Sequence, residues 1–472
     1  MEDIQMEEDA RVFEFAEFCT IRDEHWVQFK EILQRIQEGT LEEIIDHFHE
    51  LFYLAQKLIW YRNHKQRKLK GFLELKDFII NETGQEESFV EVMHFIAARA
   101  LDVKDMFPED KVRILSKNQQ ACENYTSVQI SCAIAHGFFC LIPGQDKFLD
   151  LPFPMNFNMW HEDKSKLGLE KLKFYYNYFN SQCSMPEDER YISFERKFIS
   201  ELDYDNLEND VWSNSDTTLT SVFFDEKGRI EEDEGSLMVD FANKFIGGGC
   251  MNHGCVQEEI LFLIYPELLM ALILCPKMEK NEAIMIKGPK RYSNYTGYGF
   301  STEYTGPFDD KQPLDSDSRI ERVFTAIDAI YFGSTQHEYA QFGKKSILRE
   351  LNKALIGFTK FSGEEDDDKM VLSTGNWGCG AFNGNCELKF LIQWIAASFH
   401  GRNMKYFTFG DEKCEFLGQI VKACKGKSIK EIYELLLGHS AYLKAHSKTK
   451  SWKPKKDLIS KFITKIYYRR AF

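Results

Sequence analysis

Two adjacent glutamates, Glu258 and Glu259, follow a loop of three consecutive glycines, Gly247, Gly248 and Gly249. Glycine lets the backbone approach a ligand closely, and successive N–H groups in such a loop can hold a phosphate. The loop comes after a short apolar run and before an apolar helix, which is a common place for a phosphate. A phosphate cradle beside carboxylic acids suggests cleavage of a bond in a nucleotide-like substrate.

Both parts of this pattern also have a purely structural explanation. The glycines could form a tight strand-to-helix connection, and acidic residues in a first helical turn are favoured by the helix dipole. Adjacent helical residues point about 100° apart, so Glu258 and Glu259 cannot oppose each other as glycosidase carboxylates do. One could act as acid and base while the other orients sugar hydroxyls or a water. The dinucleotide fingerprint GxGxxG would need glycine at the position of Asn252, which disfavours an oxidoreductase.

A metal site or an acyl-transfer site has little support. Cys250, His253 and Cys255 lie close in sequence, but a zinc site needs a fourth ligand and none is near. The chain contains no GxSxG motif and no obvious Cys/His nucleophile arrangement. We therefore expect no metal and no cofactor.

Two further loops could complete a nucleotide site. Residues 292–299 form a tyrosine-rich stretch whose rings could stack on a base. Residues 375–384 contain four glycines and could form a second nest for phosphate. Each could equally be a glycine-bearing loop with packed aromatic side chains. Three such loops in one domain are harder to explain structurally than any one alone.

The elements that must position these loops alternate between strands and helices after about residue 205. Strands are predicted at Leu237–Phe241, Ala283–Ile286, Val323–Phe332, Met370–Ser373 and Lys405–Phe409. Helices are predicted at Val256–Leu274, Lys345–Phe358, Glu387–Ser398 and Ser428–Leu437. This alternation is typical of an α/β layered domain, in which ligands bind beyond the strand ends.

The first 200 residues have helical spacing of apolar side chains instead. The pattern covers Phe13–Ile36, Leu41–Tyr61, Val128–Leu141 and Leu167–Phe179. We therefore expect two domains, a helical accessory domain over residues 1–205 and an α/β domain over residues 206–472. A chain of 472 residues is too long for one ordinary core, which agrees with this division.

The charge of the chain restricts the classes of molecule that it can bind. The net charge of −15 argues against general binding of DNA or RNA, and any polyanionic substrate would need a local positive site. The basic C-terminal end, residues 444–470, could bind a polyanion or form an exposed helix, and the acidic run 364–368 is typical of a solvated loop.

Twelve cysteines without a CxxC pair indicate reduced thiols in the nucleus or cytoplasm. The longest apolar stretch, Ile260–Cys275, is interrupted by Pro266 and Glu267, so no membrane association is expected.

Taken together, these motifs resemble the poly(ADP-ribose) glycohydrolase family. That family carries three glycines, a short spacer and Gln-Glu-Glu, which correspond here to residues 247–249 and 257–259. The segments 239–243, 295–298 and 374–384 also match, and 129–142 and 156–179 are similar to the helical region of long eukaryotic members. The resemblance covers about residues 110 to 420.

The resemblance implies an α/β macrodomain, with a mixed central sheet and helices on both faces, preceded by an all-helical accessory domain. It implies hydrolysis of ribose–ribose O-glycosidic bonds in poly(ADP-ribose) on modified proteins, mainly from the chain end, as part of the response to DNA damage. It also implies a monomer that needs neither metal nor cofactor. The alternative is a non-catalytic reader that binds ADP-ribose through the same glycine loops.

The resemblance also assigns roles to residues. Glu259 would protonate the leaving ribose oxygen and then activate water, Glu258 and Asn243 would hold the ribose, and Asp240 would support the glycine loop. Gln257 would read the adenine together with the backbone near Ile230 and Glu231, and Tyr298 and Phe409 would flank that base. The diphosphate would be held by Gly247, Gly248 and Gly249 and by the second loop through Asn376, Gly378, Gly380, Ala381 and Phe382.

Overall fold

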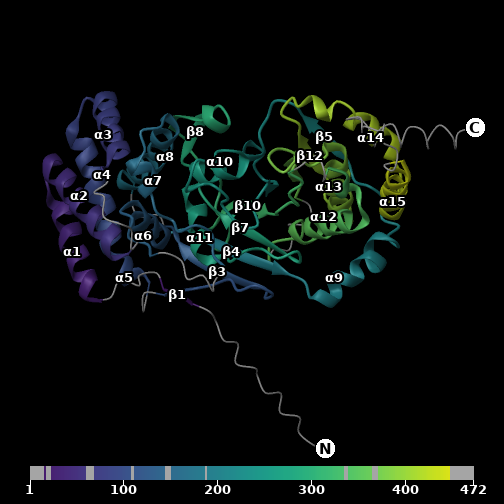
Figure 1. The fold of residues 1–472 in the computed structure, drawn as a ribbon, viewed down its shortest axis with the longest axis horizontal. Helices are drawn as coiled ribbons and strands as arrows, with labels where there is room; N and C mark the ends of the chain where they lie inside the picture. Colours follow the sequence, from purple (N-terminus) through teal and green to yellow (C-terminus); the bar gives the residue numbers. More distant parts are fainter. Residues whose placement is uncertain are drawn as a thin grey trace, which may run out of the picture.

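The computed structural model describes residues 15–17, 23–59, 68–107, 111–143, 150–185, 189–333, 338–363 and 370–446. A helical end and an α/β end lie at opposite ends of the long axis of the molecule (Figure 1). The predicted C-terminal basic run and the acidic run 364–368 lie largely or wholly outside the described residues. No helix of the described part is long and apolar enough to cross a bilayer.

Amphipathic helices build the first end. In α2 the buried side chains Ile44, Phe48, Leu51, Phe52 and Ala55 recur at helical spacing on one face. The helices of this part are α1 (Asp23–Glu38), α2 (Leu41–Leu58), α3 (Lys70–Thr83), α4 (Glu86–Leu101), α5 (Val103–Met106), α6 (Ser127–Phe138), α7 (Asn158–Glu162) and α8 (Lys166–Cys183). The helical accessory region predicted from the sequence is confirmed.

An eight-stranded mixed sheet forms the centre of the molecule. Its order is β3-β4-β7-β10-β6-β11-β12-β5. The strands are β3 (Ala121–Thr126), β4 (Tyr191–Phe198), β5 (Val222–Asp225), β6 (Leu237–Asp240), β7 (Glu282–Gly288), β10 (Ile320–Ala326), β11 (Leu372–Gly375) and β12 (Met404–Phe407). Strands β10, β6, β11, β12 and β5 are parallel, so their carboxyl ends meet at one edge.

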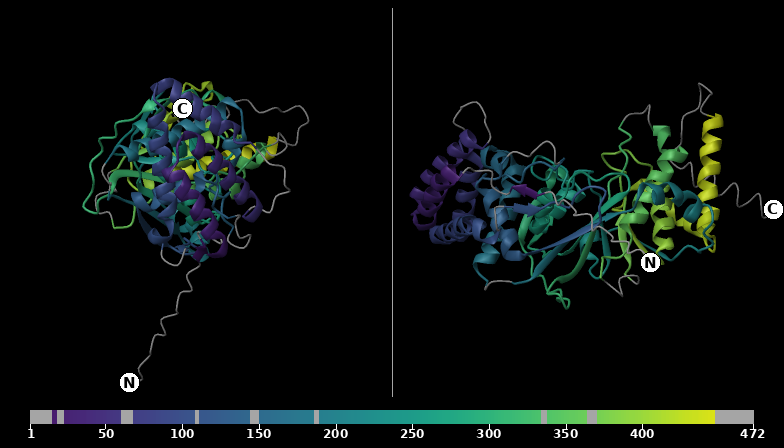
Figure 2. Two further views of the ribbon diagram at one scale, coloured as in Figure 1. Left: turned by 90° about the vertical axis from the view of Figure 1, so that its left-hand side faces the viewer. Right: turned by 90° about the horizontal axis from the view of Figure 1, so that it is seen from below.

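Both faces of the sheet are buried along its central strands, as the α/β prediction requires. On β7, Ile284 and Ile286 face the core shared with the accessory helices, whereas Ala283 and Met285 face the second core. Side chains alternate across a strand, so one strand serves two cores. The second core contains α12 (Lys344–Gly357), α13 (Cys386–Phe399), α14 (Leu417–Cys424) and α15 (Ile429–His446). These helices lie at the end of the molecule opposite α1 and α2 (Figure 2).

Some local predictions are wrong. Strands β3 and β4 come from the region expected to be all helical, so the sheet extends across the predicted boundary at residue 205. On β4 the polar residue Arg196 is fully buried and pairs with Glu282 at 2.6 Å, which hides the strand from an apolar pattern. Phe15–Glu17 is a short strand, β1, paired with β2 (Lys111–Arg113) rather than a helix. In these cases a distant partner decides the local structure.

The helix predicted over Val256–Leu274 is broken into three pieces. Helix α10 covers Gln257–Ile264, a 3-10 turn (η4) covers Pro266–Met270, and α11 covers Ala271–Leu274. Pro266 has no N–H for the helical ladder, so the α-helix ends just before it. The hairpin of β8 (Ser293–Thr296) and β9 (Glu303–Pro307) packs against α8 and α10.

Candidate active site

The loops singled out in the sequence meet at the carboxyl edge of the parallel strands. Residues 241–256 follow β6, residues 376–385 follow β11, and residues 408–411 follow β12. The segment after β5 leads into a 3-10 turn, η3 (Ile230–Glu232). The topology thus brings together segments up to about 180 residues apart in the sequence.

The two glutamates of α10 are held by backbone N–H groups of the glycine loop. Glu258 accepts hydrogen bonds from Gly247 N at 2.6 Å and from Asn243 N at 2.9 Å. Glu259 accepts from Gly249 N at 2.9 Å and, as a helix cap, from Val256 N at 2.9 Å. Both carboxyl groups are buried. The first helical turn is therefore capped as the structural explanation required, and the same bonds orient both carboxylates.

The first glycine loop does not offer its N–H groups to a ligand in this structure, contrary to the sequence-based expectation. Gly247 and Gly249 donate to the glutamates, and Gly248 N donates to Phe245 O at 3.0 Å. Gly248 has a φ of +49°, and a Cβ there would lie 2.6 Å from Glu258 Oε2 and 2.8 Å from Glu259 Oε1. Glycine is needed so that the loop can close around the two carboxylates.

The second loop presents free N–H groups. Among the described residues, the backbone N–H groups of Gly378, Gly380, Ala381 and Phe382 have no hydrogen-bond acceptor. Gly380 and Ala381 are exposed, and Gly378 has a φ of +71°. Adjacent unpaired N–H groups in a turn can bind an anion. This loop is therefore the better candidate for the diphosphate.

Asn376 supports the second loop from within. Its Oδ1 accepts from the Tyr406 hydroxyl at 2.9 Å and its Nδ2 donates to Thr408 O at 3.4 Å. The side chain thus ties the end of β11 to the end of β12, and a direct contact with substrate stays a prediction.

A buried charge cluster beneath the second loop was not found from the sequence. Lys389 of α13 forms an ion pair with Glu350 of α12, and its Nζ lies 3.8 Å from the centre of the Trp377 ring. Glu350 also accepts from Ile330 N at 3.1 Å. The sequence signal is a lysine within the mostly apolar helix 386–399, which indicates a buried partner.

Asp240 and Glu258 have pKa values well above those of ordinary carboxyl groups. Burial raises the pKa of Asp240 well above its usual value, and the neighbouring Glu259 adds to the rise. Burial raises the pKa of Glu258 as well, with Asp240 and Glu259 adding to it. Within the described part of the chain, Asp240 Oδ1 has no hydrogen-bond partner. Three carboxyl groups packed together out of water cannot all be ionised.

Replacing Asp240 by asparagine is expected to stabilise the fold at neutral and alkaline pH. The folded protein binds a proton at Asp240 that the unfolded chain has released, so wild-type stability falls as pH rises above 3.8, the ordinary pKa of the group. The asparagine side chain does not titrate, so the stability of the variant does not fall with pH for this reason. Thermal unfolding should show a midpoint about 1–4 °C above wild type at pH 8. If the difference between the two unfolding midpoints shrinks toward pH 4, the raised pKa of Asp240 is supported. If the difference does not depend on pH, the raised pKa is contradicted.

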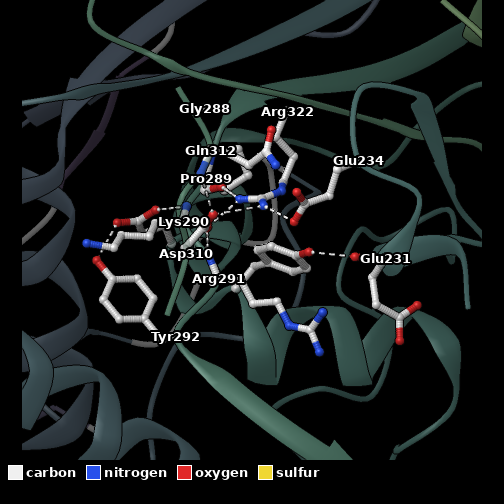
Figure 3. Close-up of polar contacts among 12 residues, drawn as sticks. Glu231, Glu234, Gly288, Pro289, Lys290, Arg291, Tyr292, Asp310, Gln312 and Arg322 are labelled. Carbon is white, nitrogen blue, oxygen red and sulfur yellow. Dashed lines mark hydrogen bonds and ion pairs between the residues drawn. The ribbon is translucent and has the colours of Figure 1, made fainter. Parts of the chain in front are cut away.

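The segment expected to read an adenine is held by buried polar contacts. The Glu231 carboxylate accepts from the Tyr295 hydroxyl, and Glu231 O accepts from the Tyr265 hydroxyl at 3.3 Å. Arg322 lies between Asp310, at 2.6 Å, and Glu234, at 3.3 Å (Figure 3). These contacts fix η3 in place. Contact of the backbone of Ile230 and Glu231 with an adenine stays a prediction.

Gln257 is occupied by the end of strand β6. Its Oε1 accepts from Phe241 N at 2.9 Å and its Nε2 donates to Val239 O at 3.0 Å. The amide therefore positions the strand end and the start of α10. Contact of this side chain with an adenine stays a prediction.

The two aromatic residues expected to flank the base lie on different segments. Phe409 follows β12, is 47 % exposed and has a φ of +53°, a strained conformation for a bulky residue. Its neighbour Thr408 N donates to Asp225 O at 2.9 Å, which places Phe409 near the segment leading to Ile230. Burial raises the pKa of Tyr298, and the charge of Glu259 adds to the rise. Contact of either ring with an adenine stays a prediction.

The spacer residues considered as zinc ligands differ in their exposure to solvent. Cys250 and Cys255 are buried, whereas His253 is exposed. Nowhere in the described ranges do three or more His, Cys, Asp or Glu side chains group as metal ligands.

Comparisons with known proteins cover both parts of the chain. The family model for the macro domain of poly(ADP-ribose) glycohydrolase matches residues 209–416, and the model for its helical domain matches residues 80–196. Poly(ADP-ribose) glycohydrolase 1 of Arabidopsis thaliana is 30% identical over 457 residues, covering 79% of this chain and 81% of its own length. Poly(ADP-ribose) glycohydrolase 1 of Caenorhabditis elegans is 34% identical over 363 residues, covering 74% of this chain and 44% of its own length.

Proposed function

Because this chain belongs to the poly(ADP-ribose) glycohydrolase family, we propose that Glu259 is the general acid and base with which it hydrolyses terminal ribose–ribose bonds of poly(ADP-ribose). The chain is a glycosyl hydrolase of macrodomain fold. The observation that carries the proposed role is the pair of carboxyl groups fixed by the glycine loop at the carboxyl edge of the sheet.

In the proposed reaction, Glu259 gives a proton to the ribose oxygen that leaves as the glycosidic C–O bond breaks. The positive charge that develops at the anomeric carbon is stabilised by the negative charge that Glu259 acquires as it gives up its proton. A water then attacks this carbon, and Glu259 takes the proton of that water, which restores the acid. Glu258 and Asn243 hold the ribose, and Asp240 keeps a proton within the cluster. No step requires a metal, since protonation drives the departure of the sugar.

The unpaired N–H groups of the second loop are proposed to bind the diphosphate. Replacing Ala381 by proline removes one of these N–H groups at an exposed position. A hydrogen bond to a charged group contributes about 1.5–3 kcal/mol, so the Kd for ADP-ribose measured by calorimetry should rise about 10- to 100-fold.

Ala381→Ser is the matched control, because it changes the side chain and keeps the N–H group. Its Kd should stay within about threefold of wild type. An unchanged Kd in the proline variant would show that the diphosphate binds elsewhere.

The proposed activity is tested by incubating the purified chain with poly(ADP-ribose) and following products over time. We expect free ADP-ribose from the earliest time points without intermediate oligomers, and the same rate in the presence of EDTA. Early oligomers would indicate endo-cleavage, and inhibition by EDTA would indicate a metal. Binding of polymer without any product would favour the non-catalytic reader.

The remaining parts of the proposal concern partners and compartment. We propose that the chain acts as a monomer in the nucleus or cytoplasm on poly(ADP-ribose) attached to proteins, without binding DNA or RNA directly. The net charge of −15 supports the last point, since nucleic acids repel an acidic surface.

A further inference from the structure

A buried lysine of the accessory helices contacts the catalytic loop. Lys171 of α8 is fully buried, and its Nζ donates to Cys250 O at 2.9 Å, to Asn252 O at 2.8 Å and to Gly254 O at 2.6 Å. These three carbonyl groups belong to the spacer between the glycine loop and Glu259. The lysine and its first acceptor are 79 residues apart in the sequence.

Burial lowers the pKa of Lys171, and the three contacts oppose this effect because they favour the protonated form. An ammonium has three N–H donors, and all three are used here, whereas a neutral amine has only two. The Nζ atom also lies 5.3 Å from the centre of the Trp160 ring, which favours a cation. Trp160 Nε1 donates to Asn252 O at 3.4 Å, so both residues hold the same loop.

The loop held by Lys171 sets the place of the Glu259 carboxylate. Gly254 N donates to Gly249 O at 3.2 Å, and a Cβ on Gly254 would lie only 2.8 Å from Glu259 Oε1. Val256 N, two residues further on, donates to Glu259 Oε2 at 2.9 Å. The Glu259 carboxylate is oriented by two donors, Val256 N and Gly249 N. A displacement of the spacer therefore moves Val256 N directly and Gly249 N through its hydrogen bond with Gly254.

We propose that Lys171 is a positioning residue for the hydrolysis, through which the accessory helices hold the spacer loop against the Glu259 carboxylate. The helical region then contributes to turnover and not only to stability. This inference rests on the proposed role of Glu259.

The test replaces Lys171 by methionine, which fills the space but leaves three buried carbonyl groups without a donor. A displacement of about 1 Å at a catalytic group can lower a rate about 10²-fold. We expect kcat on poly(ADP-ribose) to fall about 10²-fold, while the Kd for ADP-ribose, measured by calorimetry, changes less than about threefold. A purely structural role would lower the folded fraction and leave kcat per binding-competent molecule unchanged.

Arg402→Met is the matched control. Arg402 is also a buried cation that donates to backbone carbonyl groups, among them those of Phe358 at 2.8 Å, Met370 at 3.1 Å and Thr359 at 3.2 Å. It lies at the amino end of β12, away from the candidate site. We expect this variant to lose stability but to keep kcat per binding-competent molecule within about threefold of wild type.

If Lys171→Met does not fold, Trp160→Phe decides instead, because it removes one donor from the same loop. We expect a fall in kcat of about fivefold with unchanged ADP-ribose affinity. The inference is overturned if folded Lys171→Met or, failing that, Trp160→Phe keeps the kcat of wild type, or if kcat and affinity fall in parallel. A wild-type chain that releases no ADP-ribose would instead overturn the proposed function itself.

Discussion

Replacing Glu259 by glutamine should lower kcat for poly(ADP-ribose) hydrolysis by about 10²–10⁴-fold, the range associated with loss of a general acid or base. The amide cannot give a proton to the leaving ribose oxygen. It can still accept one hydrogen bond, from Gly249 N or from Val256 N, so the loop should stay close to its wild-type position. The rate is measured as release of ADP-ribose, and the Kd for ADP-ribose by calorimetry should stay within about tenfold of wild type.

A second glutamate-to-glutamine variant distinguishes the loss of a catalytic group from the loss of a helix cap. Glu431 caps α15 in the way that Glu259 caps α10, with its Oε2 accepting from Ser428 N at 2.8 Å. Glu431→Gln should therefore lose a comparable cap, which contributes about 1 kcal/mol to stability, and should keep the wild-type kcat for poly(ADP-ribose) hydrolysis. Rapid hydrolysis by the Glu259 variant would remove this residue from its proposed role. If kcat fell equally in both variants, the fall would be due to the lost helix cap.

Replacing Gly248 by alanine should abolish most of the activity by another route. The new Cβ would lie 2.6 Å from Glu258 Oε2 and 2.8 Å from Glu259 Oε1, and the loop or the carboxylates must move. A shift of about 1 Å in a catalytic group costs about 10²-fold in rate. We expect a loss of at least about this size in kcat, measured on poly(ADP-ribose), because both carboxylates are displaced together.

Gly401→Ala controls for backbone strain in this experiment. Gly401 has a φ of +70°, also in the left-handed region, but a Cβ there would meet nothing within 4 Å. Each variant should lose about 1–2 kcal/mol of stability from the left-handed conformation. Only Gly248→Ala should lose turnover. If both variants keep wild-type kcat, the glycine loop does not position the glutamates as we describe.

Much of the fold was predictable because its signals are local. The helical spacing of Ile44, Phe48, Leu51 and Ala55 predicts α2 to within three residues at its end. Strand β4 was missed because its pairing partners are distant in sequence and because the buried Arg196 resembles a surface residue until Glu282 is placed beside it. Local patterns contain no information on such long-range pairs.

The candidate site was predictable as a set of residues but not as a set of contacts. Residue types and spacing singled out Gly247–Gly249, Glu258, Glu259 and residues 375–384, and the structure brings them to one edge of the sheet. The direction of each N–H group could not be read from the sequence. The first glycine loop therefore looked like a phosphate cradle, although its N–H groups bind the glutamates and the unpaired ones belong to the second loop.

The sequence by itself determined the family, the order of helical and α/β parts, and the identity of the acidic pair, because all of these depend on residue type and short spacing. Only the tertiary structure decided which groups are paired, which carboxyl groups have a raised pKa, and that Lys171 reaches the spacer across 79 residues. Hydrogen-bond direction and burial depend on where distant segments meet, and a one-dimensional pattern does not specify that meeting point.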